Sequence, residues 1–349
     1  MHKNKGFFAL LLLLSTLGVL VGVAKERIPS SQQVRLSVKA LEQASNKRNF
    51  LTGSYTESWS HSGAENFELF GSLRAKLDHR GHVYVMDYGD FRIKELGADG
   101  HPVRIYGAGK GQGPEEFLSL SDIEILQNGE VWVSDPGTGR VIIFDSKGQL
   151  IRTLRVQPLT HRLALAPGGG FFSNLTLGSE KLLGRYDAEG IIQEKFGSLL
   201  ESQANHSMAL NGWIESDGRL GLVYAGGLST ILAAYNPDAS QRFLVRTIEP
   251  FSLPKIRQDS EKKWIDSDSR RAAIALSVND DEIHVLTYFV EGVRRRGVID
   301  TYRWSDGTYL YSRRVPGKST WLTVGDGYVV TTHHSTVTKW QWKRTAPRV

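Results

Sequence analysis

Residues 77–105 read LDHRGHVYVMDYGDFRIKELGADGHPVRI, and residues 125–153 read ILQNGEVWVSDPGTGRVIIFDSKGQLIRT. Aligned without a gap at an offset of 48 residues, the two stretches share glycine, valine, aspartate and arginine at equivalent positions. The chain therefore contains an internal repeat, and the repeated unit decides the fold.

Each unit has the sequence features of an antiparallel meander. Residues 83–85 and 131–133 are β-branched and aromatic, which suits strands that are buried on both faces. A second strand follows at residues 92–96 and 140–144, and a turn containing Gly100 or Gly148 leads to a third strand. The unit recurs along the chain with decreasing sequence similarity, which gives six units of about 40–60 residues between residues 65 and 343.

A repeat of this length with four strands per unit predicts an all-β fold, a β-propeller with six blades of four antiparallel strands, or with seven. One such sheet cannot bury both of its faces, whereas sheets arranged radially cover one another. We expect a strand around Ser54–Ser60 to complete the last blade and close the ring. A parallel α/β fold is disfavoured, because no strong helical period separates the strands.

The N-terminal residues predict export. Lys3 and Lys5 precede the uncharged run Gly6–Ala24, so residues 1–24 are expected to be a signal peptide or an uncleaved signal-anchor helix. Either outcome places the rest outside the cytoplasmic membrane, in the periplasm or an equivalent space, soluble or anchored by a transmembrane helix. Residues 25–50 are expected to form a polar linker with a possible short helix. The propeller would span residues 51–345, with an exposed loop or short helix inserted at residues 250–271.

Gly81–Asp87, Gly111–Phe117 and an apolar lead-in before the first unit are three stretches that resemble bacterial six-bladed β-propeller proteins of the NHL-like type. Gly81–Asp87 looks like the family's G-N-[IV]-Y-V-x-D strand, and Gly111–Phe117 resembles its inter-blade G-x-G-P-G-E-F linker, with Glu115 at the usual glycine. Phe67, Leu69, Phe70 and Gly71 form an apolar lead-in. The resemblance implies a propeller with an exported or membrane-attached location, but no single activity. We expect the linker to be a crossover between blades in which Phe117 packs between sheets.

The composition excludes some chemistry and leaves two function classes. The chain has no cysteine, which rules out disulfides and thiolate ligands. The net charge of +6 is too diffuse to predict nucleic-acid binding. No G-x-S-x-G elbow and no H-E-x-x-H pair is present, so we predict no catalytic or metal-binding residues and no cofactor.

The leading hypothesis is therefore a non-enzymatic module that binds a protein, peptide or glycan. The alternative is a lactonase or lyase that uses Ca²⁺ or Zn²⁺ at the channel mouth. The membrane would be a partner through the N-terminal segment if that segment is uncleaved. The candidate binding face consists of five residues on the loops and strands of the first two units: Tyr88, Asp90, Phe91, Arg92 and Arg140. Asp87 and Asp135 end equivalent strands, and we expect them to accept backbone N–H bonds and to pair with Arg92 and Arg140.

Overall fold

The computed structural model describes residues 30–345 except residues 72, 159–160, 176–178, 202–205, 250, 260–261, 267, 280, 292–293 and 318. The expected signal segment, residues 1–24, lies outside the described residues. Within the described part of the chain, no helix is long and apolar enough to cross a membrane. The helix α1 (His206–Ala209) has four residues.

The described residues form an all-β structure with six four-stranded antiparallel sheets. The first sheet contains β3 (Leu73–Leu77), β4 (Val83–Asp87), β5 (Arg92–Leu96) and β6 (Pro102–Tyr106), and the second contains β9 (Asp122–Ile125), β10 (Val131–Asp135), β11 (Arg140–Phe144) and β12 (Leu150–Arg155). The third contains β13 (Ala164–Leu165), β14 (Phe171–Asn174), β15 (Leu183–Tyr186) and β16 (Ile192–Phe196). The fourth contains β17 (Gly212–Glu215), β18 (Leu222–Gly226), β19 (Ile231–Tyr235) and β20 (Gln241–Arg246).

The fifth sheet contains β23 (Ala275–Asn279), β24 (Glu282–Glu291), β25 (Arg294–Arg303) and β26 (Tyr309–Arg314). The sixth contains β27 (Trp321–Gly325), β28 (Tyr328–His333), β29 (Thr336–Arg344) and β2 (Gly53–His61). A two-stranded parallel sheet, β7 (Gly109–Lys110) with β8 (Glu116–Phe117), lies within the expected crossover linker. Phe117 is fully buried between the first and second sheets, as the sequence predicts.

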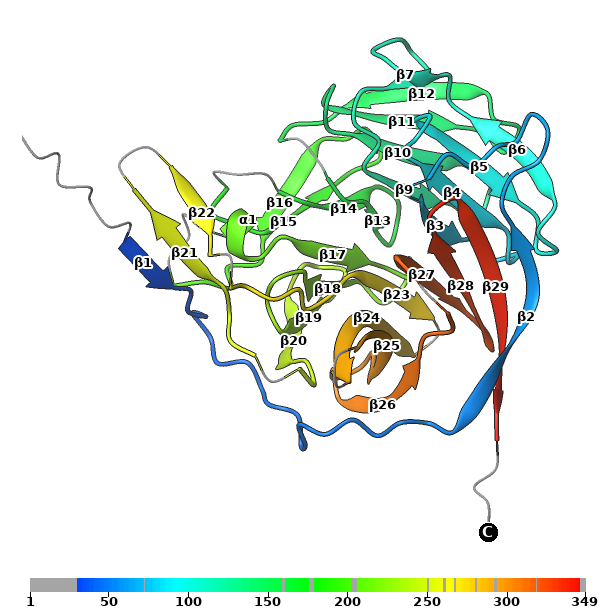
Figure 1. Ribbon diagram of the computed structural model, residues 1–349. Coiled ribbons are helices and arrows are strands. Elements are labelled where there is room, and N and C mark those ends of the chain that lie inside the picture. The colour runs from blue at the N-terminus through cyan, green and yellow to red at the C-terminus, as the bar shows by residue number, and fades with distance from the viewer. Residues whose placement is uncertain are drawn as a thin grey trace, which may run out of the picture.

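The six sheets are arranged around a common centre (Figure 1). The innermost strand, called the first strand of each sheet below, is β3, β9, β13, β17, β23 or β27. Neighbouring first strands contact one another: β3 contacts β9 and β27, and β17 contacts β13 and β23. The core lies between the sheets. Met86 and Ile93 of the first sheet, for example, pack with Val131 and Ile142 of the second. All five residues of β4, β10 and β18 are buried, because each of these strands is covered on both faces.

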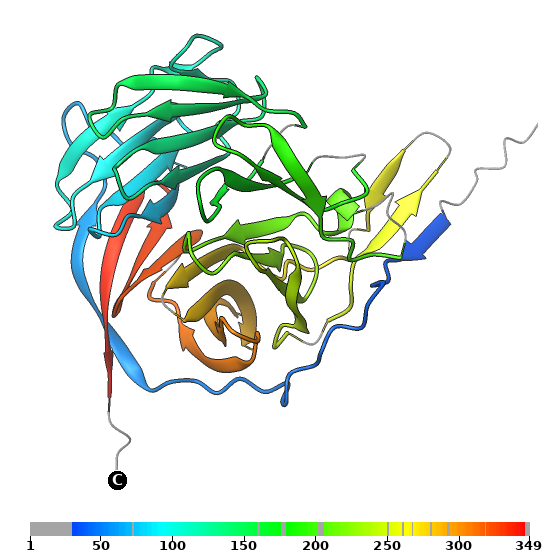
Figure 2. The same ribbon diagram turned by 180° about the vertical axis from the view of Figure 1, so that it is seen from behind.

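The ends of the chain meet in one sheet. Strand β2 pairs antiparallel with β29, from Gly53 opposite Arg344 to His61 opposite Val337. This confirms the prediction that a strand around residues 54–60 joins the last unit. Figure 2 shows the same pairing from behind, with the blue and red strands side by side. The ring is thus closed by hydrogen bonds between sequence-distant strands.

The segment before β2 differs from the expectation. The short helix considered for residues 25–50 is not found in residues 30–50, which are extended and follow the outside of the sheets (Figure 1). Leu36 bridges to Leu200, Leu41 to Val245 and Phe50 to Ser312. The helical spacing of apolar residues did not predict the conformation, because these residues do not share one buried face. Val34 is buried, whereas Leu41 is 66% exposed.

The insertion at residues 250–271 is also different. It contains the hairpin β21 (Lys255–Gln258) and β22 (Lys263–Ile265), and β21 pairs with β1 (Ser30–Gln33). The expectation of a loop or short helix was wrong because the N-terminal segment supplies a hydrogen-bonding partner from far away in the sequence. Arg48 fixes the segment further: its guanidinium pairs with Asp300 at 2.8 Å and with Glu249.

Candidate functional site

The innermost strands have a cavity at each end. The cavity at their starts, about 430 Å³, is the arginine mouth, lined by Leu73, Arg74, Tyr88, Trp213, Arg271, Ile274, Thr320, Trp321 and His334. The cavity at their other ends, about 840 Å³, is the acidic mouth, whose polar lining includes Lys76, Glu124 and Glu215. Strand β3 contributes to both cavities, because Arg74, its second residue, lines the arginine mouth and Lys76, its fourth residue, lines the acidic mouth.

Aromatic rings surround Arg74 in the arginine mouth. Its guanidinium carbon lies 5.3 Å from the ring centroid of Tyr88, 5.0 Å from that of Trp213 and 5.1 Å from that of Trp321. The two indoles meet edge to face, with centroids 4.8 Å apart. Their N–H groups donate to backbone carbonyls, of Ala273 at 3.1 Å and Ala75 at 2.9 Å. Both rings are therefore fixed by the sheets, and they stabilise the cation through cation–π contacts.

Arg162 lies beside the arginine mouth, against Trp213, although it is not part of the cavity lining, which contains Arg271 as a second cation. Its guanidinium carbon lies 4.0 Å from the centroid of Trp213, and its Nη1 donates to the carbonyl of Ser121 at 2.9 Å. Burial, followed by the charge of Arg74, lowers the pKa of Arg162 to about 10. Arg74 Nη1 donates to the same carbonyl of Ser121 at 3.4 Å.

The loop before β13 fixes the backbone at Arg162. The Oγ of Ser121 donates to the carbonyl of His161 at 2.8 Å, and the Oγ of Ser173 donates to the carbonyl of Arg162 at 2.5 Å. The N–H of Leu163 donates to a carboxylate oxygen of Asp122 at 3.2 Å. Contacts to two neighbouring strands therefore hold the arginine at the mouth.

The acidic mouth contains one lysine among three carboxylates. Lys76 Nζ lies 2.5 Å from Glu124, 3.2 Å from Glu215 and 3.9 Å from Asp122. Burial raises the pKa of Glu124 and of Glu215, and Lys76 opposes that rise. Burial would lower the pKa of Lys76, but the three carboxylates raise it above its ordinary value. The channel is consequently polarised, with guanidinium groups at one end and an excess of carboxylates at the other.

Of the five residues predicted as a binding face, only Tyr88 lines the arginine mouth. Asp90 forms an ion pair with the buried Lys94 at 2.8 Å. The ring centroid of Phe91 lies 5.0 Å from the ammonium of Lys110. Arg92 donates to the carbonyl of Ala108 at 3.5 Å. Arg140 has a different set of partners: Asp135 at 3.4 Å and the backbone carbonyls of Gln112, Gly113 and Glu116. These four side chains contact other residues near their own loops, and the structure does not bring them together with Tyr88.

The two strand-ending aspartates have the expected structural role. Asp87 accepts the N–H of Gly89 at 2.9 Å, and Asp135 accepts the N–H of Ser119 at 2.8 Å. Asp135 pairs with Arg140 as predicted, but the ion-pair partner of Asp87 is Lys94, at 2.7 Å. Lys94 replaces Arg92 in this role because its fully buried ammonium faces Asp87 across the hairpin.

Sequence reasoning missed Arg74, Arg162, Trp213 and Trp321. They come from four different sheets or their connections, so no local motif contains two of them. The available signal was the pair of basic residues inside Leu73–Leu77, a segment otherwise suited to a buried strand. A cation in an innermost strand must face the central axis, where it needs a partner.

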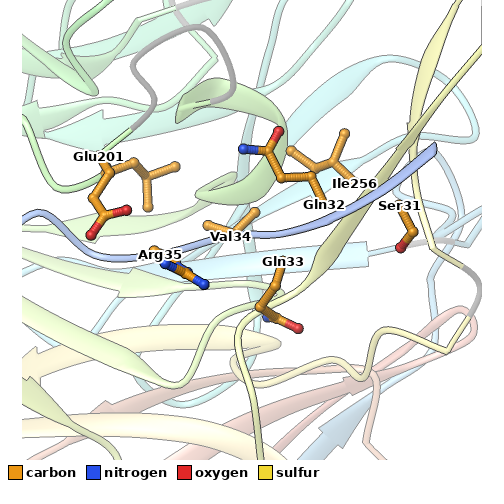
Figure 3. Close-up of a pocket in the computed structure, with 8 residues that line it drawn as sticks. Ser31, Gln32, Gln33, Val34, Arg35, Glu201 and Ile256 are labelled. Atoms are coloured by element: carbon orange, nitrogen blue, oxygen red, sulfur yellow. The ribbon is translucent and has the colours of Figure 1, made fainter.

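A third cavity, about 310 Å³, lies beside β1 (Figure 3). Gln32 and Gln33 point to opposite sides of the strand there, and Arg35 and Glu201 lie at its far end. Gln33 Nε2 donates to the carbonyl of Leu253 at 2.7 Å. This cavity follows from the packing of the N-terminal segment on the insertion and on residues 200–201.

Comparison with known proteins identifies the fold class. A protein of the DUF4221 family from Bacteroides vulgatus is similar, with a TM-score of 0.55, 11% identity and coverage of 86% of this chain and 99% of its own. Virginiamycin B lyase from Staphylococcus aureus is similar with a TM-score of 0.51 and 12% identity, covering 82% of this chain and 99% of its own. These likenesses, together with the repeated four-stranded sheets, make the protein a β-propeller.

No protein-family model matches the chain, and no curated protein matches it by sequence. At this level of identity the solved structures define the fold alone. Within the described part of the chain, no three histidine or acidic side chains are grouped so as to hold a metal ion.

Proposed function

We propose that this protein is an exported or membrane-tethered β-propeller that acts as a non-enzymatic binding module, with the arginine mouth as its binding site. One observation carries the proposal. Arg74 and Arg162 lie side by side against fixed aromatic rings at an open mouth, and neither forms an ion pair within the described residues. Cations that are partly withdrawn from water are normally paired, so this arrangement suits recognition of a ligand.

We further propose that the six four-stranded sheets are the six blades of one ring, organised as in NHL-like propellers. The pairing of β2 with β29 supports this count, because it completes the sixth sheet and leaves no first or last blade open. The basic residues and apolar run of residues 1–24 support export. N-terminal sequencing of the mature protein tests this part of the proposal: an N-terminus near residue 25 indicates cleavage, and an intact N-terminus indicates an anchor.

The binding role is tested with the full-length chain in detergent, immobilised and exposed to peptide arrays, glycan arrays and extracytoplasmic proteins. We expect a defined ligand that the wild type retains and the Tyr88→Ala variant loses. Arg219→Gln at the acidic mouth is the matched control, because Arg219 is exposed and its ion-pair partner among the described residues is the neighbouring Asp217. Absence of any ligand from all three screens, or a ligand that both variants retain, refutes the proposed site.

The alternative is a propeller lactonase or lyase that uses Ca²⁺ or Zn²⁺. It requires a stoichiometric metal whose removal abolishes hydrolysis or elimination. Metal analysis of the purified protein, combined with an assay of lactone hydrolysis before and after chelation, separates the two classes. No grouping of ligands in the described residues favours the enzyme.

A further inference from the structure

We propose that the arginine mouth binds an oxyanion, a carboxylate or phosphate, carried on a flat apolar body, with Arg74 and Arg162 holding the oxyanion and the rings of Trp213, Trp321 and Tyr88 packing against the body. This inference rests on the proposed function, because it takes the arginine mouth as the binding site and names the chemistry of its ligand.

The first argument is the contrast with the two buried lysines of the first sheet. Lys94 lies 2.7 Å from Asp87 and 2.8 Å from Asp90, and Lys76 lies 2.5 Å from Glu124. Arg74 and Arg162 have no such carboxylate in the described residues; the acceptor they share is the carbonyl of Ser121. A neutral oxygen cannot balance two positive charges, so the site has an unfilled demand for negative charge.

The second argument is the supply of hydrogen-bond donors. A guanidinium group offers five N–H donors. The Nε of Arg162 is buried and has no acceptor within the described residues, and each guanidinium group donates through its Nη1 to the carbonyl of Ser121. A carboxylate or phosphate accepts paired N–H bonds from such groups, which a single carbonyl does not. An oxyanion between the two arginines would also offset the burial and, after it, the repulsion from Arg74 that lower the pKa of Arg162.

The third argument concerns the walls. Trp213 lies within 5.0 Å of Arg74 and 4.0 Å of Arg162, so rings cover the faces of the cations. A guanidinium stacked in this way presents its N–H edge to a ligand. Leu73 and Ile274 add apolar surface to the lining, which also contains Arg271, His334 and Thr320. A cavity of about 430 Å³ accommodates one ring with its charged group, or the end of a larger ligand.

The nearest carboxylate in the channel does not remove this demand. Asp122 is the carboxylate that raises the pKa of Arg162 most. Its oxygens already accept the N–H groups of Ile123 and Leu163, and one of them lies 3.9 Å from the ammonium of Lys76. Glu215, which also raises the pKa of Arg162, belongs to the Lys76 cluster at the other end. The arginine mouth therefore stays positive, and it selects anions over cations.

The test uses the full-length protein in detergent and four probes: benzoate, phenyl phosphate, inorganic phosphate and benzamidine. Benzamidine has nearly the shape of benzoate but carries a positive charge. Titration calorimetry and tryptophan fluorescence report binding, since Trp213 and Trp321 line the site. We expect saturable binding of benzoate or phenyl phosphate, weaker binding of inorganic phosphate, and no binding of benzamidine. Which aromatic anion binds more tightly distinguishes a carboxylate ligand from a phosphate ligand.

The variants identify the residues that hold the anion. Arg74→Gln and Arg162→Gln should each weaken binding of the aromatic anion by about tenfold or more, because each removes charge-assisted hydrogen bonds. Arg219→Gln at the acidic mouth should leave the affinity unchanged. Circular dichroism and thermal unfolding establish that each variant is folded. If Arg162→Gln does not fold, Arg162→Lys keeps the charge but loses the fork geometry, and it should still weaken binding.

Two results overturn the inference: no saturable binding of either aromatic anion at low salt, or equal affinities of the wild type and both glutamine variants. The outcomes separate this inference from the proposed function. A screened ligand that needs Tyr88 but neither arginine keeps the binding module and refutes the oxyanion chemistry. Arginine-dependent binding of the aromatic anions, without any macromolecular ligand, keeps the oxyanion site and refutes the broader role.

Discussion

Replacing Lys76 by methionine tests the electrostatics of the channel. The substitution keeps most of the side-chain volume but removes the ammonium that contacts Glu124, Glu215 and Asp122 at 2.5, 3.2 and 3.9 Å. The three carboxylates would then face one another with no cation between them. Breaking a buried ion pair by removing one partner costs about 3–5 kcal/mol.

The cost should depend on pH, because the carboxyl groups escape repulsion by binding protons. Burial raises the pKa of Glu124 and Glu215 and Lys76 opposes that rise, so removing Lys76 should raise both pKa values further. The folded variant then holds protons that the unfolded chain releases above a pKa of about 4.3. Keeping one such glutamate protonated costs about 1 kcal/mol at about pH 5 and about 5 kcal/mol at about pH 8. We therefore expect Lys76→Met to lose about 1–2 kcal/mol at the lower pH and about 3–5 kcal/mol at the higher pH.

Urea unfolding monitored by circular dichroism at the two pH values measures these differences. Lys147→Met is the control, because Lys147 lies exposed in a turn, and it should change the unfolding free energy by less than about 0.5 kcal/mol at either pH. Adding Glu215→Gln to Lys76→Met should recover part of the loss at high pH. An equal loss at both pH values, or no recovery in the double variant, would refute the electrostatic explanation.

Three further changes test other parts of the structure. Arg48→Gln should lower the unfolding free energy by about 3 kcal/mol in urea titrations, because it leaves the buried carboxylate of Asp300 without its ion pair. A loss below about 1 kcal/mol would contradict a stabilising role of this ion pair. Burial lowers the pKa of His284 to about 3, so the wild type should lose about 1.4 kcal/mol of stability per pH unit from this group as the pH falls below about 6.5. His284→Gln should remove that part of the slope, and an unchanged slope between about pH 6.5 and 4.5 would contradict a neutral buried histidine. Gly100→Ala should lower the midpoint of thermal unfolding, at a cost of about 1–3 kcal/mol, because the residue has a φ of +86° and a Cβ would lie 2.6 Å from the ring of Trp59. An unchanged midpoint would show that the turn adapts.

The repeat alone predicted much of the fold. The strands at residues 83–87 and 131–135 and the glycine turns after them are local signals, because β-strand propensity and positive φ angles depend on few neighbouring residues. The closing strand near residues 54–60 was also predicted, since a ring of sheets needs a partner for its last blade. The N-terminal segment was not, because its conformation is set by hydrogen bonds to strands more than 150 residues away.

In contrast to the fold, little of the candidate site could be predicted from the sequence. Tyr88 was predicted because it follows a strand of the repeat, whereas the two cations beside it were not. Whether an arginine is paired depends on which side chains other sheets bring to the axis, and Arg74 and Arg162 come from regions 88 residues apart. The sequence by itself determined the strands, the turns and the closed order of the units, because these follow from local backbone preferences and from the need of each sheet to be covered. Only the tertiary structure decided the polarity of the channel, because the balance of charges there is a sum over side chains that meet only when the ring is complete.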